Sequence, residues 1–200
     1  MTVKSETRDK MISGAVDLIS RRGLNATSMR EVVRHTNTPR GSIKHHFPNG
    51  RLELITEAVE LAGKQTTLPL QQVMKEHHVI VGLDIFIEGW KNILKTSHYQ
   101  AGCPILAVAA EQYIGDDSAP NVDAETMLLT QADNIFKNWQ KILMDALHKD
   151  GVNLDKAARL ANLIISSIEG TVAMCRAAKS MTPLEDVQHE LKLILKVAIE

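Results

Sequence analysis

Apolar residues recur three and four positions apart along most of the chain, which is the spacing of one face of an α-helix. The first clear example is formed by Ile12, Ala15, Val16 and Ile19, and Gly23 ends that segment. No stretch of the sequence sustains the two-residue alternation of a half-buried strand. The hydrophobic pattern therefore predicts an all-α protein.

The glycine and proline residues between the periodic segments set the expected helix boundaries. After the first helix we expect short helices over 28–34 and 39–46 and a long helix over 51–76, kinked or broken at Pro69. The remaining expected helices cover 79–97, 103–114, 122–150, 154–178 and 183–199.

Residues 27–47 contain capping and turn residues for two short helices. Thr27 and Thr38 are good N-caps, Pro39 suits the first position of a helix, and Asn37 suits a left-handed turn. Two short helices joined by a turn of three or four residues form a helix-turn-helix, whose second helix enters the major groove of DNA. This part of the chain is therefore predicted to bind double-stranded DNA, with Ile43 and Phe47 facing inward.

The second helix of this pair begins with chemistry suited to DNA. Arg40 can form two hydrogen bonds with a guanine, Lys44 can reach a phosphate or a second base, and Gly41 leaves room for close approach. The candidate DNA-binding residues are Thr27, Ser28, Arg30, Thr38, Arg40, Ser42, Lys44, His45, His46 and Arg51. On charge alone, the solvated face of two amphipathic helices would explain these residues better. The turn residues, the helix lengths and the N-terminal position of the pair favour DNA binding.

Charge is distributed unevenly along a chain whose net charge is only −1. Residues 1–55 contain ten Lys and Arg and five Asp and Glu, whereas the remaining residues contain 13 and 19. A basic N-terminal quarter suits a polyanionic partner, which supports the prediction of DNA binding.

Composition limits the other classes of protein. With 44% hydrophobic and 24% charged residues, the chain is globular. The longest apolar run, 103–110, is too short to cross a membrane and the N-terminus lacks a signal-peptide core, so we expect a cytoplasmic protein without a membrane partner. Two cysteines are too few for a disulfide framework or a zinc ribbon, and we expect no metal site and no cofactor.

An all-α enzyme is the main competing class, and little in the sequence supports it. Carboxylate-bridged di-iron sites need Glu-x-x-His on two helices, but Glu31 and His35, like Glu185 and His189, are four residues apart. No nucleophile elbow or catalytic-cysteine signature is present. We therefore expect no enzymatic activity. A helical adaptor that binds only protein is the alternative to a DNA-binding regulator.

The stretch T27-S-M-R-E-V-V, together with T38-P-R-G-S-I-K-H-H-F-P-N-G-R-L-E-L, resembles the DNA-binding signature of the TetR family of transcriptional regulators. The turn Phe47-Pro-Asn-Gly-Arg51 and the later A101-G-C-P-I-L-A-V-A-A-E111 are most similar to its LmrA/YxaF-like branch. The resemblance is specific over residues 7–60, and the C-terminal half otherwise fits the family only in helix number and length.

The resemblance implies a homodimeric repressor of about nine helices. Its N-terminal domain, 1–50, would bind an operator, and its C-terminal domain, 51–200, would bind a small-molecule effector and dimerise. By position, the resemblance assigns DNA contacts to Thr27, Ser28, Arg30, Arg40, Ser42, Lys44, His46 and Arg51. The family usually has tyrosine where this chain has Lys44, and a lysine supplies charge to a phosphate without the aromatic packing.

Most of the few aromatic residues lie within 79–150, which suits an apolar ligand cavity with polar groups such as His98, Glu111 and Gln112. The candidate ligand-binding residues are Phe86, Trp90, Cys103, Leu106, Met127, Phe136 and Trp139. Ordinary core packing is the alternative for any one of them. Such a lining favours a planar or apolar effector over a sugar or an ion.

Two C-terminal segments, 154–178 and 184–199, have wide apolar faces, and the first also carries small residues such as Ser166 and Gly170. Two such helices from each subunit would form a symmetric four-helix interface. The candidate dimerisation residues are Ile165, Ile168, Val172, Leu191, Ile194 and Leu195. Packing within one subunit is the alternative.

Overall fold

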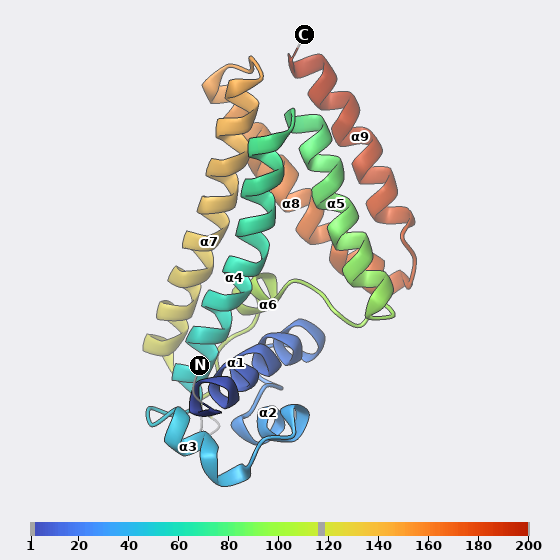
Figure 1. The fold of residues 1–200 in the computed structure, drawn as a ribbon. Coiled ribbons are helices and arrows are strands. Elements are labelled where there is room, and N and C mark those ends of the chain that lie inside the picture. Colours follow the sequence, from blue (N-terminus) through green and yellow to red (C-terminus); the bar gives the residue numbers. More distant parts are fainter. Residues whose placement is uncertain (1–2, 116–118, 200) are drawn as a thin grey trace. The chain divides into compact units, whose positions relative to one another are not determined.

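The computed structural model describes residues 3–115 and 119–199, in which all regular elements are helical apart from one isolated β-bridge between Ile114 and Pro120 (Figure 1). The helices are α1 (Val3–Arg22), α2 (Met29–Thr36), the 3₁₀-helix η1 (Arg40–Ser42), α3 (Ile43–His46), α4 (Arg51–Glu76), α5 (Val79–Thr96), α6 (Pro104–Ala110), α7 (Val122–Lys149), α8 (Leu154–Ala178) and α9 (Thr182–Ile199). The prediction of an all-α fold is confirmed.

The chain forms two compact units that alternate along the sequence. The first comprises Met1–Lys64 and Cys103–Asp133, and the second comprises Gln65–Gly102 and Asn134–Glu200. The helices α4 and α7 therefore each have residues in both units. The domain boundary expected at residue 50 stays a prediction, because these packing units group the helix-turn-helix with α6 and the first part of α7.

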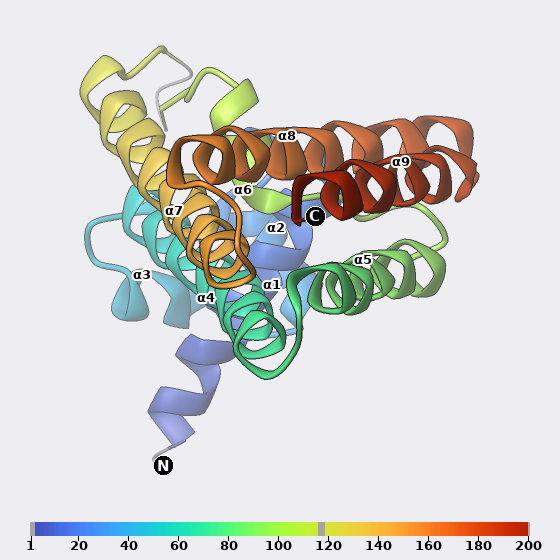
Figure 2. The ribbon, with the colours of Figure 1, turned by 90° about the horizontal axis from the view of Figure 1, so that it is seen from above.

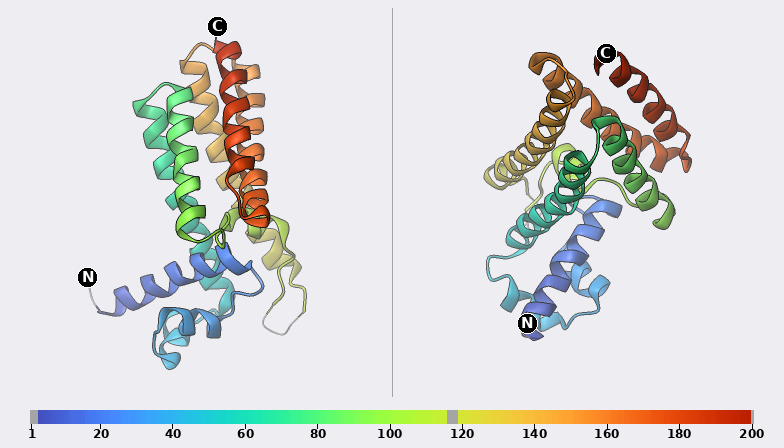
Figure 3. Two further views of the ribbon diagram at one scale, coloured as in Figure 1. Left: turned by 90° about the vertical axis from the view of Figure 1, so that its right-hand side faces the viewer. Right: turned by 45° about the horizontal axis from the view of Figure 1, so that its top comes forward.

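In the first unit, α1 packs against α2 and α6. Figure 3 shows α1, in dark blue, beside the lighter blue α2 and α3. Three of the four residues of the apolar face predicted for α1 are buried here with residues from the neighbouring helices, and Val16 is half-buried. This core includes Met11, Ile12, Ala15, Leu18, Ile19, Val32, Val33, Ile43, Phe47, Leu54, Ile55 and Val108.

In the second unit, α8 and α9 lie side by side and α5 packs against both (Figure 2). Polar side chains join α5 to α9. Asp84 accepts hydrogen bonds from Gln188 (2.9 Å) and Lys192 (2.6 Å), and Lys91 donates one to Gln188 (2.6 Å). These contacts fix the register of α9 along α5.

The helix α4 has the bounds expected from the sequence and is not broken at Pro69, although proline lacks an N–H and leaves the carbonyl of Gln65 without its helical partner. A kink at this residue stays a prediction. The helix α6 ends at Ala110, before the expected end at residue 114, because Glu111 is extended (φ −110°, ψ 137°).

Candidate functional site

The helices α2 and α3 form the helix-turn-helix that the sequence predicts. Ser28 is the N-cap of α2, since its hydroxyl accepts a hydrogen bond from the N–H of Glu31 (3.2 Å). The expected cap at Thr27 is therefore wrong by one residue. Asn37 ends α2 in the left-handed conformation that was expected (φ 52°, ψ 44°).

The second helix of the motif is shorter than expected. Thr38 does not cap it, because its hydroxyl pairs with the hydroxyl of Thr36 (2.9 Å). The backbone of Pro39 is extended, and its carbonyl accepts hydrogen bonds from the N–H (3.0 Å) and the hydroxyl (2.7 Å) of Ser42. Residues 39–46 therefore form the 3₁₀ turn η1 followed by one turn of α-helix, α3.

Exposed cations surround this motif. Arg30 on α2, Arg40 in η1, and Lys44 and His45 on α3 are all exposed. Arg30, Arg40 and Lys44 form no ion pair with any carboxylate in the part of the chain that the structure describes. A cation without an intramolecular partner is available to neutralise a phosphate or to hydrogen-bond a base.

Three predicted DNA-binding residues do not belong to this surface. Thr27, His46 and Arg51 are only 0%, 8% and 5% exposed. The hydroxyl of Thr27 donates to the carbonyl of Gly23 (2.9 Å), and the guanidinium of Arg51 donates to three backbone carbonyls. Tertiary packing covers these three side chains, and their DNA contacts stay a prediction.

Arg8 of α1 holds the end of α3 in place. Its guanidinium lies 4.9 Å from the centre of the Phe47 ring, and its Nε donates to the carbonyl of His46 (3.3 Å). Both terminal nitrogens bind the carboxylate of Glu57 on α4, and this hydrogen bonding raises the pKa of Arg8 above its ordinary value. Ile43 and Phe47 are buried, as predicted. The helix α3 is therefore held in place by the packing of Ile43 and Phe47 and by the permanently charged side chain of Arg8.

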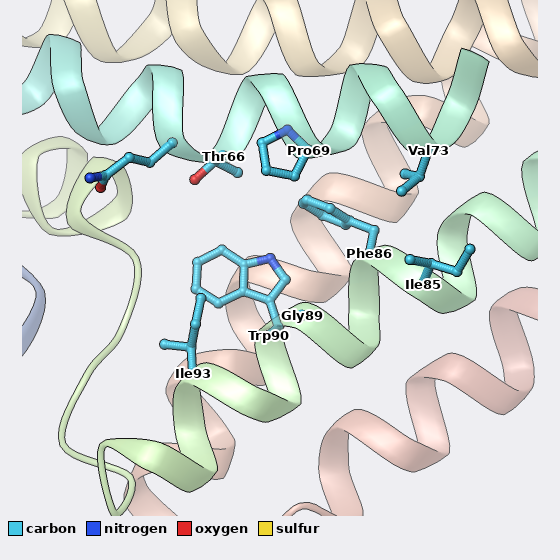
Figure 4. Close-up of a pocket in the computed structure, with 9 residues that line it drawn as sticks. Thr66, Pro69, Val73, Ile85, Phe86, Gly89, Trp90 and Ile93 are labelled. Atoms are coloured by element: carbon cyan, nitrogen blue, oxygen red, sulfur yellow. The ribbon is translucent and has the colours of Figure 1, made fainter. Parts of the chain in front are cut away.

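A cavity of about 300 Å³ lies between the second half of α4 and α5 (Figure 4). The rings of Pro69, Phe86 and Trp90 face this space from the two helices. The lining residues are Gln65, Thr66, Pro69, Val73, Ile85, Phe86, Gly89, Trp90 and Ile93. None of them is ionisable, so the cavity suits a neutral ligand. Its volume is at the lower end of the range for ligand pockets, roughly 300–1,000 Å³.

Two features make this cavity accessible and supply it with a free hydroxyl group. A Cβ on Gly89 would meet no atom within 4 Å, so this exposed helical glycine leaves an opening between Ile85 and Ile93. The hydroxyl of Thr66 forms no hydrogen bond within the described residues, whereas that of Thr56 donates to the carbonyl four residues earlier (2.8 Å). A ligand can therefore find both apolar surface and one free hydroxyl.

The predicted ligand-binding residues do not form one cluster. Phe86 and Trp90 line the cavity, but Phe136 and Trp139 do not. Their rings instead pack edge to face with centres 5.3 Å apart, and Nε1 of Trp139 donates to Thr67 (2.8 Å). The contacts of Trp139 therefore agree with the alternative for these residues, which is ordinary core packing.

The remaining predicted ligand-binding residues, Cys103, Leu106 and Met127, belong to the first unit and are not among those lining this cavity. Cys103 is buried and caps α6, since its Sγ accepts a hydrogen bond from the N–H of Leu106 (3.5 Å). Burial raises the pKa of the other thiol, Cys175, so that it stays protonated at neutral pH.

Most of the predicted dimerisation residues are already covered within a single chain. Ile165, Ile168, Val172, Leu191 and Leu195 are buried, and only Ile194 is 39% exposed. Five of the six side chains therefore pack within one subunit, and a role for them in dimerisation stays a prediction. The exposed apolar and small residues of these two helices include Leu154, Leu163, Ser166, Gly170, Ala173, Met174, Ala177 and Ala178 on α8 and Leu193, Ile194 and Val197 on α9.

Among residues 3–115 and 119–199, no group of three or more His, Cys, Asp and Glu side chains is arranged to hold a metal ion. No described helix combines the length and the apolar character that a membrane span requires.

Two family models match the chain. The model for bacterial regulatory proteins of the tetR family matches residues 11–59, and the model for the C-terminal domain of LmrA/YxaF-like transcriptional regulators matches residues 80–190. An uncharacterised HTH-type transcriptional regulator of Mycobacterium tuberculosis (strain H37Rv) is 33% identical over 190 residues, covering 94% of this chain and 93% of the relative. LmrA of Bacillus subtilis (strain 168) is 22% identical over 192 residues, covering 96% and 97%.

Solved structures share the fold. A TetR transcriptional regulator from Legionella pneumophila has a TM-score of 0.79 at 21% identity, covering 94% of this chain and 96% of its own. The regulatory protein TetR from Rhodobacter sphaeroides has a TM-score of 0.80 at 13% identity, covering 93% and 97%.

Proposed function

Because the chain belongs to the TetR family of transcriptional regulators, we propose that it is a homodimeric repressor released from its operator by a small, neutral, largely apolar effector. The observation that carries the proposal is the group of exposed cations on the helix-turn-helix, Arg30, Arg40 and Lys44, which have no ion-pair partner in the described residues. Arg40 precedes α3 and is the candidate for reading a base, whereas Lys44 is the candidate for a phosphate.

A row of exposed small and apolar residues on α8 supports the proposed dimer. Leu163, Gly170, Ala173 and Ala177 recur at helical spacing on its solvent side, and small residues allow two helices to approach closely. A twofold dimer would place two helix-turn-helix motifs on successive major grooves, about 34–36 Å apart. Operator affinity then depends steeply on the distance between the two motifs.

The α4–α5 cavity is the proposed effector site. The helix α4 is continuous from Arg51, beside the helix-turn-helix, to the cavity residues Thr66, Pro69 and Val73. A ligand that favours the non-binding arrangement by about 3 kcal/mol would weaken operator binding roughly 150-fold. Equal operator affinity with and without a bound effector would contradict release by an effector.

Selection of genomic fragments with purified protein tests the function directly. We expect enrichment of a palindromic site, because a twofold dimer reads two equivalent half-sites. A protein that binds no duplex even at low ionic strength would instead favour the helical adaptor.

Changing Arg40 to alanine is expected to cost about 1–3 kcal/mol of operator binding and to relax the base preference at one position of each half-site. The measurement is binding to the selected site and to its single-base variants. Changing Lys44 to alanine is the comparison, because loss of a phosphate contact should weaken all sequences alike and reduce the salt slope by about one. Unchanged base preference in the Arg40 variant would remove Arg40 from this role.

Changing Gly89 to leucine is expected to abolish effector binding and leave operator binding unchanged, because a Cβ there meets no atom within 4 Å and the rest of the side chain would occupy the opening. Naphthol, a neutral bicyclic compound with one hydroxyl, is a suitable first probe, and quenching of tryptophan fluorescence reports its binding beside Trp90. The matched control is Asn92→Leu, since Asn92 is exposed on α5 but does not line the cavity. Equal quenching in the Gly89 variant and in the control would place the ligand elsewhere.

A further inference from the structure

The turn between α1 and α2 is bound on its N–H side by a carboxylate from a distant part of the chain. Gly23 has a positive φ of 89°, and the backbone N–H groups of Leu24 and Asn25 follow it. Both N–H groups donate to Glu111, at 3.0 Å to Oε1 and 3.1 Å to Oε2. Consecutive N–H groups in such a turn form a concave anion-binding site, and Glu111 occupies it.

The same turn is bound on its carbonyl side by a cation. Arg51, the first residue of α4, donates from Nη2 to the carbonyl of Leu24 (2.6 Å) and from Nε to that of Thr27 (2.9 Å). Its Nη1 donates to the carbonyl of Ile114 (2.6 Å), and its guanidinium lies 4.9 Å from the centre of the buried Tyr113 ring. One buried guanidinium therefore joins α4, the α1–α2 turn and the segment that follows α6.

Asn25 completes the connection between the turn and residues 111–114. Its side-chain nitrogen donates to the carbonyl of Gln112 (2.7 Å), and its side-chain oxygen accepts from the N–H of Ile114 (3.0 Å). Gly23 is fitted closely to the same arrangement, since a Cβ there would lie 2.1 Å from Oε1 of Glu111. The segment 111–114 and the turn are thus matched to each other by charge, by hydrogen bonds and by shape.

We propose that Glu111, Asn25 and Arg51 are positioning residues for operator binding, which together form a polar clamp. The clamped turn leads directly into Ser28, the N-cap of α2, so the clamp fixes where the helix-turn-helix begins. It also ties the motif to α6, because Glu111 immediately follows that helix. A displacement of α6 therefore pulls on the start of the helix-turn-helix through residues 111–114. This inference rests on the proposed DNA binding and does not require an effector.

The variant Glu111→Gln separates this role from simple electrostatics, because the two explanations predict opposite changes in operator affinity. Removing a negative charge should strengthen attraction to DNA if charge alone matters. Weakening of the clamp should instead lower operator binding on the order of tenfold, because the amide NH₂ of glutamine cannot accept from one of the two N–H groups and the remaining bond is no longer to a charged group. The matched control is Glu88→Gln on α5, an exposed residue whose side chain pairs with Lys91 and not with the turn. The salt slope should stay unchanged, since no phosphate contact is removed.

Amide hydrogen exchange supplies a readout that needs no DNA. The N–H groups of Leu24 and Asn25 should exchange faster in Glu111→Gln than in the parent, with no change in Glu88→Gln. Asn25→Ala is the second variant, because Asn25 is exposed and its truncation leaves the core intact. Operator binding as tight as the parent's in both variants, or unchanged exchange at the two amides, would overturn the clamp. A parent protein that binds no operator would contradict the proposed function instead.

Discussion

A Gly170→Glu variant is expected to be a folded monomer that binds the operator about a hundredfold more weakly than the parent, since linking two binding modules gains roughly 10²–10⁴ in affinity. Gly170 is exposed on α8, and a side chain there meets no atom within 4 Å of its Cβ. The substitution therefore leaves the packing of the single chain unchanged. In a twofold interface it introduces the same charge from both subunits, close to the axis if the small residues of α8 meet there.

The oligomeric state is measured by sedimentation, the fold by circular dichroism, and operator binding by fluorescence anisotropy. Gln71→Glu provides the matched control, because it adds the same charge at an exposed position of α4. We expect the control to remain dimeric and to bind the operator like the parent. A Gly170→Glu protein that is still dimeric would move the interface away from this face of α8.

An Arg51→Met variant is expected to lose about 3 kcal/mol or more of unfolding free energy, because each hydrogen bond to a charged group contributes about 1.5–3 kcal/mol. Arg51 makes three such bonds to backbone carbonyls in the buried part of the first unit. Methionine fills a similar volume but donates no hydrogen bond, so these carbonyls lose their donors. The change is measured by urea denaturation monitored by circular dichroism.

Lys95→Met is the control for Arg51→Met, since Lys95 is an exposed cation on α5 and should change stability by less than about 0.5 kcal/mol. The family pattern would give a different result, with Arg51 touching phosphate. In that case the variant would lose about one unit of salt slope in addition to the loss of stability. This second outcome would show that Arg51 leaves its buried position when DNA binds.

The order and type of the helices could be predicted from the sequence because both depend on local chemistry. The periodic apolar residues of α1 and the left-handed Asn37 act through their immediate neighbours, and the structure places both as expected. The expected caps at Thr27 and Thr38 and the helix expected to begin at Pro39 were exceptions in this region. The extended backbone of Pro39 leads into a 3₁₀ turn, so only one turn of α-helix, α3, remains of the longer helix expected there.

The burial of cations could not be predicted in the same way. Arg51 is the first residue of a helix and directly follows a turn. The sequence around a cation in that position is the same whether its side chain faces solvent or the core. Its partners Leu24 and Ile114 are 27 and 63 residues away in the chain. Glu111 was expected to serve a ligand cavity, yet its carboxylate binds Leu24, which is 87 residues away. Contacts at such separations depend on tertiary packing.

The C-terminal helices show the same limit. Ile165 and Leu191 lie on wide apolar helix faces. The periodic pattern of apolar residues alone does not say which part of such a face contacts another helix of the same chain. The structure assigns that side to packing within the subunit. Several small residues of α8, among them Ser166 and Gly170, which the sequence also showed, are on the outside.

Pro69 gives the cavity wall a mechanical property of its own. At this residue α4 lacks one backbone hydrogen bond, that of the Gln65 carbonyl, and both residues line the cavity. Bending stiffness of a helix comes largely from that ladder of bonds, so α4 is most compliant where a ligand would touch it. A ligand bound at this point can therefore change the curvature of α4 at a smaller cost in free energy than a ligand bound one helical turn further along.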